Sequence, residues 1–317
     1  MSLHFCLPRL AWPILLCIAL LLGTSGIAPA AIVSKVASTK HNLSASSPGT
    51  VKATSESQIC VFCHTPHNAN IKAVAPLWNR ELTTLIYTTY TSASMDAVTD
   101  QPGYGSKLCL SCHDGALAIG TVGVLNNAGP VAIMMDGTDA GTIPAGAGEF
   151  TGYTRNLGMD LSNDHPVSFP YDVTLADNDG ELRTPPVDVG GTAIVAKRTA
   201  GVAPNPLFPL DSDAQMQCTT CHDPHTWETD PGKGNHKFLR GNRLQQVQSL
   251  GGSFSRSDDS MCLACHDKAG ALWTYSAHAN QLVADETYLE EAAIVRDFPV
   301  DTPVWKAACL NCHDTHT

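Results

Sequence analysis

The chain has 317 residues and an acidic balance, with 30 Asp and Glu residues against 19 Lys and Arg and a formal net charge of -11. An acidic protein of this kind is a poor partner for nucleic acid or anionic lipid, so no nucleic-acid partner is expected. Aromatic residues make up only 6% of the chain, and long apolar stretches with helical periodicity are absent. Such a sequence predicts a poor core if protein side chains alone have to build it.

Residues 1–30 have the layout of a secretory signal peptide. Arg9 is the only charge before the apolar run from Ala11 to Leu22, and Ala28-Pro29-Ala30 supplies a small-residue cleavage site. The run is shorter than the ~20 residues that span a membrane, and no later segment is long and apolar enough to do so. The sequence therefore predicts an exported protein without a membrane span, outside the cell, at its surface or in the periplasm of a Gram-negative bacterium.

Ten cysteines follow this segment, and all ten belong to Cys-x-x-Cys-His motifs. In chain order the motifs hold Cys60, Cys63 and His64; Cys109, Cys112 and His113; Cys218, Cys221 and His222; Cys262, Cys265 and His266; and Cys309, Cys312 and His313. Disulfide bonds are the common use of cysteines in exported proteins. Zinc is the other alternative, but it usually takes four ligands from two Cys-x-x-Cys pairs. Neither alternative explains a histidine directly after the second cysteine in all five motifs.

Covalent haem attachment does explain this spacing. Two thiols separated by two residues can each add to one vinyl group of a single porphyrin, and the following imidazole then reaches the iron from the same side. The sequence predicts five covalently attached haems c, numbered here 1 to 5 in motif order, with the five motif histidines as proximal ligands.

The motifs alternate between two types. In A-type motifs a second histidine stands three residues after the motif histidine, as in His67, His225 and His316; the B-type motifs, the second and fourth, lack it. The order A-B-A-B-A indicates a repeated two-haem unit followed by a further A-type motif. We expect an N-terminal two-haem module at 31–120, a haem-free insert rich in Gly, Pro and Asp at 121–215, and a three-haem module at 216–317.

Five irons need five further axial ligands if all are six-coordinate. The candidates are histidines, which makes bis-histidine ligation the simpler expectation and predicts low-spin haems of low potential. His67 and His225 lie too close to their own motifs to cross the porphyrin, so each should reach a different haem. The expected distal ligands are His41, His67, His165, His225 and His278, followed by His236 and His316.

The expected fold is a multihaem cytochrome c in which coil, short helices and a few short strands wrap a stack of haems. Within the insert, Gly191-Thr-Ala-Ile-Val-Ala-Lys197 has the alternation of a small strand or hairpin. Because the porphyrins are large flat apolar surfaces, most of the hydrophobic core is expected to be cofactor.

Several segments resemble one known family. They are Lys40-His-Asn-Leu-Ser44, Ile59-Cys-Val-Phe-Cys-His-Thr-Pro-His67, Pro76-Leu-Trp-Asn-Arg80, Leu108-Cys-Leu-Ser-Cys-His-Asp-Gly115, Asp164-His-Pro-Val167, Cys218-Thr-Thr-Cys-His-Asp-Pro-His225 and Phe238-Leu-Arg240. They are similar to the extracellular tetrahaem cytochromes of metal-reducing bacteria that polymerise into conductive filaments, the cytochrome nanowires. The resemblance covers about residues 40–270, and the fifth motif departs from it. It implies a continuous stack of bis-histidine haems and one axial histidine, at His67, donated to a neighbouring subunit.

Three functions are compatible with these features. The first is an electron conduit in extracellular electron transfer, as a filament or not, whose partners are other redox cytochromes, extracellular electron acceptors or further copies of the chain. The second is a soluble periplasmic electron shuttle. The third is a multihaem reductase, which needs one haem with an open axial position; five intact motifs and an excess of histidines argue against it.

Overall fold

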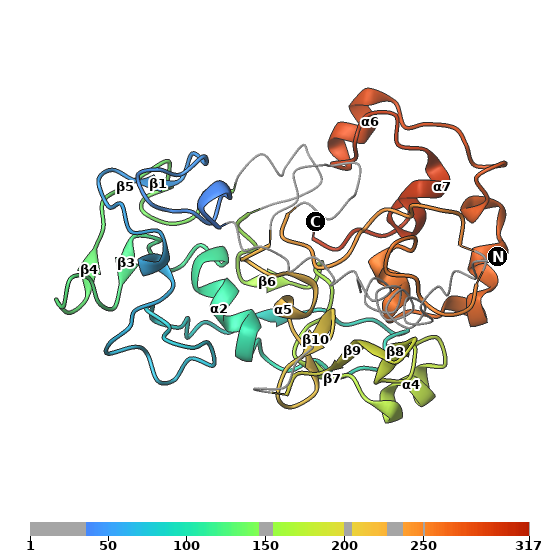
Figure 1. Ribbon diagram of the computed structural model, residues 1–317, viewed down its shortest axis with the longest axis horizontal. Coiled ribbons are helices and arrows are strands. Elements are labelled where there is room, and N and C mark those ends of the chain that lie inside the picture. The colour runs from blue at the N-terminus through green and yellow to red at the C-terminus, as the bar shows by residue number, and fades with distance from the viewer. Residues whose placement is uncertain (1–35, 146–154, 200–204, 227–236, 250, 317) are drawn as a thin grey trace, which may run out of the picture. The chain divides into compact units, whose positions relative to one another are not determined.

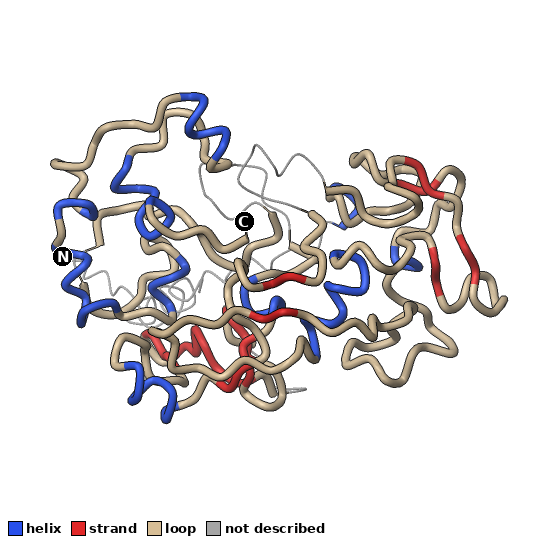
Figure 2. The backbone as a smooth tube through the Cα atoms, turned by 180° about the vertical axis from the view of Figure 1, so that it is seen from behind, coloured by secondary structure: helices blue, strands red, loops and turns tan. Residues whose placement is uncertain are grey.

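Loops form most of the backbone in the computed structural model, which describes residues 36–145, 155–199, 205–226, 237–249 and 251–316 (Figures 1 and 2). From Ser34 onward the chain forms one unit, and its division into three modules stays a prediction. The prediction of short helices and small strands in a mostly irregular chain is confirmed. Residues 1–30, expected to be a signal peptide, lie outside the described residues.

The helices are short, and several coincide with the haem motifs. The α-helices are α2 (Tyr104–His113), α4 (Val173–Asp179), α5 (Cys218–Cys221), α6 (Glu290–Val295) and α7 (Val304–Ala307). The 3-10 helices are η1 (Val36–Ser38), η2 (Cys60–Phe62), η4 (Met261–Ala264), η5 (Lys268–Tyr275), η6 (Ala277–Ala279) and η7 (Ala308–Asn311). In the described part of the chain, no helix is long and apolar enough to cross a membrane.

Helix α4 shows how local chemistry sets these short lengths. The Asp172 carboxylate accepts a hydrogen bond of 2.9 Å from the Leu175 amide, which caps the first turn. Gly180 ends the helix at φ 70°, a left-handed conformation that glycine adopts without steric cost. With only seven residues between these two signals, the helix has room for two turns.

The strands form five small sheets. β1 (Lys52–Ala53) pairs with β5 (Met135–Asp136), β3 (Thr121–Val122) with β4 (Val131–Ala132), and β7 (Phe169–Pro170) with β11 (Gln215–Met216), all antiparallel. β2 (Thr88–Thr89) runs parallel to β6 (Asp160–Leu161). The largest sheet has the order β10-β9-β8, from β8 (Val187–Val189), β9 (Thr192–Lys197) and β10 (Phe208–Leu210).

The hairpin expected near Gly191 is confirmed. Strands β8 and β9 are antiparallel and joined by Gly190 and Gly191, at φ 58° and 77°. Two successive positive φ angles match the two-residue turn that best fits the twist of a hairpin, and glycine is favoured at both positions.

Buried apolar side chains form separate small clusters. The largest has twelve members and joins α4, the β10-β9-β8 sheet and the turn of the fourth motif; they are Phe169, Tyr171, Leu175, Val187, Ile194, Val195, Phe208, Leu210, Met216, Phe254, Leu263 and Ala264. The other four clusters contain three or four buried residues each. No single protein core organises the described residues, in line with a fold built around cofactors.

Arg80 is a buried cation, only 3% exposed, that ties the first motif region to the second. Its guanidinium donates to the Ile119, Thr121 and Ala118 carbonyls at 2.6, 3.1 and 3.0 Å. Arg80→Met would remove all three of these hydrogen bonds, including the one to the buried Ile119 carbonyl, so we expect the free energy of unfolding to fall by about 2–4 kcal/mol. Guanidinium unfolding of the haem-loaded protein measures this; Arg256→Met, at an exposed position, is the control. Equal stability of the two variants would contradict this role of Arg80.

Candidate haem sites

Each Cys-x-x-Cys-His motif forms a helical turn. In four motifs the amide of the motif histidine donates to the carbonyl of the first cysteine, at 2.8, 2.9, 2.9 and 3.0 Å for His64, His222, His266 and His313. The second motif is the last part of helix α2. A turn of this kind brings two thiols and the following imidazole to one side of the backbone, as attachment to one porphyrin requires. The short helices η2, α5, η4 and η7 and the end of α2 therefore are the motifs themselves.

Three of these turns are each hydrogen-bonded to another segment of the chain. At the first motif, Thr65 donates to Leu77 and Asn79 donates to Cys63, at 2.8 and 2.9 Å. The segment Phe238–Arg240 repeats this pattern at the third motif, and Glu181–Arg183 repeats it at the fourth. We call the three segments 77–79, 238–240 and 181–183 the bracing segments. They fix the backbone on both sides of the motif histidine.

The bracing segments and one further loop also orient proximal imidazoles. Nδ1 of His64 bonds the Pro76 carbonyl at 2.9 Å, and Nδ1 of His222 bonds the Lys237 carbonyl at 3.0 Å. Nδ1 of His113 bonds the carbonyl of Arg155 at 2.6 Å. A carbonyl only accepts, so Nδ1 carries the proton and Nε2 keeps the lone pair that binds a metal.

Eight histidines face one another in four pairs at nearly constant separation. The ring centroids are 6.2 Å apart for His41 and His113, 6.3 Å for His64 and His225, 6.4 Å for His165 and His266, and 6.1 Å for His222 and His316. Each pair joins one motif histidine with one histidine from the predicted distal set.

This separation fits two imidazoles on opposite sides of one iron. With a metal–nitrogen bond of about 2.0 Å and a ring centre about 1.1 Å beyond the nitrogen, two trans imidazoles have centroids about 6.2 Å apart. Direct ring stacking would bring the centroids closer, as the 4.2 Å between His41 and Phe238 illustrates. The residues present therefore fit haem iron, and haems 1 to 4 would each be held between two histidines.

The protonation of four of the eight paired imidazoles agrees with a role as metal ligands, which must be neutral. Burial lowers the pKa of His41 to about 3 and that of His222 to about 4, and it also lowers the pKa of His113 and His165. These four rings are therefore neutral at pH 7 and available to a metal through a lone pair.

Two distal candidates differ because a carboxylate contacts each ring. Nδ1 of His225 bonds the Asp223 carboxylate at 3.1 Å, which raises the pKa of His225. Burial acts to lower the pKa of His316, but the Asp164 carboxylate, 2.7 Å from its Nδ1, together with Cys218 and Asp314, raises this pKa. Sequence reasoning missed both carboxylates, although Asp223 follows a motif histidine and Asp164 precedes His165.

The thiols of successive motifs lie near one another. Cys109 and Cys218 share a hydrogen bond that lowers the pKa of Cys218 to about 7, and Cys262 and Cys309 share another that lowers the pKa of Cys262 to about 7. Burial raises the pKa of Cys63 and that of Cys221 to about 12. The second largest cause is the charge of a neighbouring thiol, Cys112 for Cys63 and Cys262 for Cys221. Each contact joins neighbouring motifs in the sequence.

The second and third motifs are also joined through side chains of their helices. Ser106 of α2 donates to the Gln217 side chain at 2.6 Å and accepts from the Cys218 amide at 3.0 Å. A Cβ on Gly105 would lie 2.4 Å from the Thr219 hydroxyl, so glycine permits this close approach of α2 and α5. Two haems attached at these helices would lie side by side.

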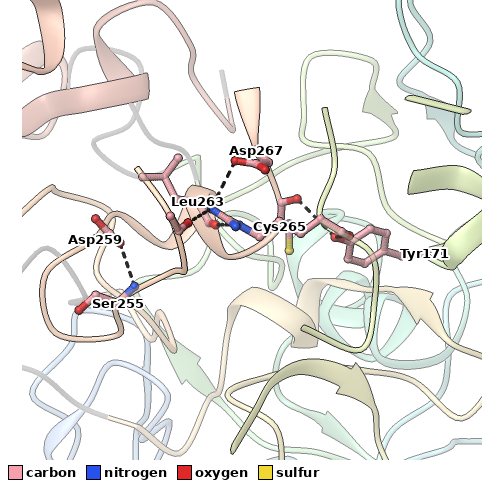
Figure 3. Close-up of polar contacts among 8 residues, drawn as sticks. Tyr171, Ser255, Asp259, Leu263, Cys265 and Asp267 are labelled. Carbon is pink, nitrogen blue, oxygen red and sulfur yellow. Dashed lines mark hydrogen bonds and ion pairs between the residues drawn. The ribbon is translucent and has the colours of Figure 1, made fainter. Parts of the chain in front are cut away.

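The fourth motif is held by side chains from the insert, as the close-up in Figure 3 shows. The Tyr171 hydroxyl lies 2.5 Å from the Arg183 carbonyl and 3.3 Å from the Cys265 carbonyl. Arg183 donates from Nε to the Leu263 carbonyl at 2.7 Å. Arg183 also lies 3.5 Å from the Asp267 carboxylate. The predicted insert therefore positions motif backbone and also carries His165.

Three predicted distal histidines are not placed in pairs. His67 and His278 are exposed, with no ring contact to another histidine in the described part of the chain. His236 lies outside the described residues. The proximal His313 is exposed and likewise faces no imidazole among residues 36–145, 155–199, 205–226, 237–249 and 251–316. The ligand of haem 5 opposite His313 stays a prediction.

Turns that present two thiols and an imidazole, four of them faced by a second imidazole at the axial distance, define a c-type cytochrome, an electron carrier with covalently bound haem c. The family model described as "Cytochrome c554 and c-prime" matches residues 261–317, which hold the fourth and fifth motifs and His316. The chain is similar to that family over this segment. No curated protein matches the chain.

Proposed function

We propose that the chain is an exported pentahaem cytochrome that conducts electrons along five haems in the order 1-2-3-4-5. The observation that carries this proposal is the set of four imidazole pairs at 6.1–6.4 Å. Thiol contacts between motifs that follow one another in the sequence support the linear order. The haems supply the redox chemistry, and the protein sets their spacing, their potentials and their access to solvent.

In two A-type motifs, the second histidine faces the proximal histidine of the preceding A-type motif. The second histidine of the third motif, His225, faces the proximal histidine of the first, and His316 of the fifth motif faces that of the third. Each therefore serves the preceding A-type haem. For His67 the preceding A-type haem would be haem 5 of a neighbouring copy, next to His313. His67 and His313 are both exposed, so such a bond can form between chains.

Exposed apolar side chains accompany both partners of this proposed contact. Near His67, Ile71 is 96% exposed and Val74 56%. Before the fifth motif, Leu282 and Leu289 are 83% and 80% exposed. A neighbouring copy bound over both segments would bury these side chains. A filament of copies joined through His67 would make the stack continuous, and it would pass electrons to other redox cytochromes or to extracellular acceptors.

Electron paramagnetic resonance of the ferric protein, assembled and then dissociated, tests this proposal together with a mass measurement of haem content. Five haems per chain, all low spin when assembled and one high spin on dissociation, are expected. His67→Ala should give the same high-spin haem in both states, whereas His278→Ala should change neither.

Other outcomes point to the other functions. Low-spin haems only, with a His278→Ala variant that creates a high-spin haem, would mean that haem 5 is completed within one chain, as suits a periplasmic shuttle. A high-spin haem present in every state would mean an open iron and favour a reductase. Fewer than five haems would overturn the count taken from the motifs.

A further inference from the structure

The four imidazole pairs differ in the angle between the two ring planes, and the difference follows motif type. The planes meet at 20° in His64–His225 and 41° in His222–His316, the pairs of A-type motifs. They meet at 83° in His41–His113 and 76° in His165–His266, the pairs of B-type motifs. Imidazoles with nearly parallel planes donate to the same iron d orbital, and perpendicular ones to different orbitals. The two kinds of haem therefore give different ferric spectra.

The partner of the distal Nδ1 follows the same division. His225 and His316, on the A-type haems, bond the carboxylates of Asp223 and Asp164. On the B-type haems, His165 bonds only the Pro166 carbonyl at 3.0 Å, and Nδ1 of His41 is buried without a hydrogen-bond partner of good geometry. A carboxylate makes a coordinated imidazole a stronger electron donor than a neutral carbonyl does.

Asp164 has the stronger position of the two carboxylates. It is 8% exposed, and its 2.7 Å bond to His316 is the shorter one. No cation contacts its carboxylate among the described residues. Asp223, in contrast, lies 3.2 Å from Arg240, which compensates its charge. The negative charge of Asp164 therefore acts on one imidazole in a poorly hydrated place, where its effect is largest.

Backbone pairing holds this contact in register. Asp164 and His316 form an antiparallel bridge, and the His165 amide donates to the Thr315 carbonyl at 3.0 Å. The segment that carries Asp164 also carries the distal candidate of haem 4. One strand-like contact thus fixes the position of Asp164 against His316 without requiring any further side-chain bond.

We propose that Asp164 is a positioning residue that, through its hydrogen bond to His316, lowers the reduction potential of haem 3 below the potentials of haems 2 and 4. This inference rests on the proposed bis-histidine ligation of haem 3. A more strongly donating imidazole stabilises ferric over ferrous iron, which lowers the potential. Haem 3 is the middle of five, so its potential sets how readily an electron passes from one half of the chain to the other.

The test is a redox titration of the full haem-loaded chain, followed by low-temperature paramagnetic resonance. His316→Ala identifies the signal of haem 3, because that low-spin signal disappears in this variant. Asp164→Asn keeps the size and an acceptor oxygen but removes the charge. At the wild-type midpoint of haem 3, Asp164→Asn is expected to raise the ratio of reduced to oxidised haem 3 at least tenfold, a shift of 59 mV for one electron.

Two variants separate this effect from a structural one. Asp164→Glu restores the charge and should return the midpoint most of the way to that of the wild type. Asp223→Asn is the matched variant at haem 1, where the compensating Arg240 predicts a smaller shift. The inference is overturned if Asp164→Asn leaves the midpoint unchanged, if Asp164→Glu shifts it equally, or if Asp164→Asn makes haem 3 high spin. If His316→Ala leaves every haem low spin, the proposed ligation itself fails, which is a distinct result.

Discussion

Replacing His225 with alanine is expected to convert one haem from low spin to high spin and to weaken the contact between the first and third motifs. His225 lies 161 positions from His64 in the chain, and their rings are the axial pair proposed for haem 1. Removing one axial ligand leaves five-coordinate or water-bound ferric iron, because no other imidazole faces His64 in the described residues. Paramagnetic resonance and the visible spectrum of the ferric protein measure the change.

His67→Ala is the matched control, since His67 occupies the position of His225 in the repeated motif. In the dissociated chain, His67→Ala should leave the spin state of every haem unchanged, because His67 is exposed and faces no histidine among the described residues of its own chain. A low-spin His225→Ala protein would show that the pair does not ligate iron. The same new high-spin signal in both variants would show that position in the repeat does not decide the partner.

A chain made without haem attachment is expected to lose its tertiary structure altogether. The described apolar side chains form five separate clusters, and most strands are two or three residues long. Clusters of this size offset little of the conformational entropy that folding removes. Amide hydrogen exchange should show protection close to that of an unfolded chain, and far-ultraviolet circular dichroism should show no cooperative unfolding.

Replacing both cysteines of one motif measures how much the attachment of that haem contributes to the stability of the protein. Cys218→Ser with Cys221→Ser removes the attachment of haem 3, whose motif contacts the second motif through Ser106. Cys309→Ser with Cys312→Ser removes that of haem 5, at the end of the proposed order. The first pair should lower the free energy of unfolding more than the second. A stable, cooperatively folded protein without any haem would contradict the view that cofactor replaces a protein core.

The sequence was sufficient to predict the fold class and the attachment motifs, because covalent haem chemistry needs a fixed local spacing. It also led to the prediction that His225 reaches a haem other than its own, since the chain between them is too short to cross a porphyrin. Which haem each histidine faces could not be predicted. The rings of His41 and His113 are 72 positions apart in the chain, and only the loop paths between them decide such a contact.

Two other features could not be predicted from the sequence, because they also depend on contacts between distant parts of the chain. The bracing segment of the fourth motif, Glu181–Arg183, lies about 80 residues before that motif, whereas those of the first and third follow their motifs closely. No local pattern marks a segment that pairs at such a distance. Asp164 is likewise an ordinary acidic residue in the sequence. Its importance comes from a bridge to His316, 152 positions further along the chain.

The carbonyl bonds to the proximal imidazoles bear on the speed of electron movement. When a haem gains an electron its charge changes by one, and surrounding dipoles that must turn to follow that change add to the activation barrier. The carbonyls of Pro76 and Lys237 adjoin bracing segments that are hydrogen-bonded to the motif backbone. Dipoles fixed in this way need little reorientation. In the proposed haem stack, loops braced in this way would therefore add little reorganisation energy, and electrons would cross between neighbouring haems over small barriers.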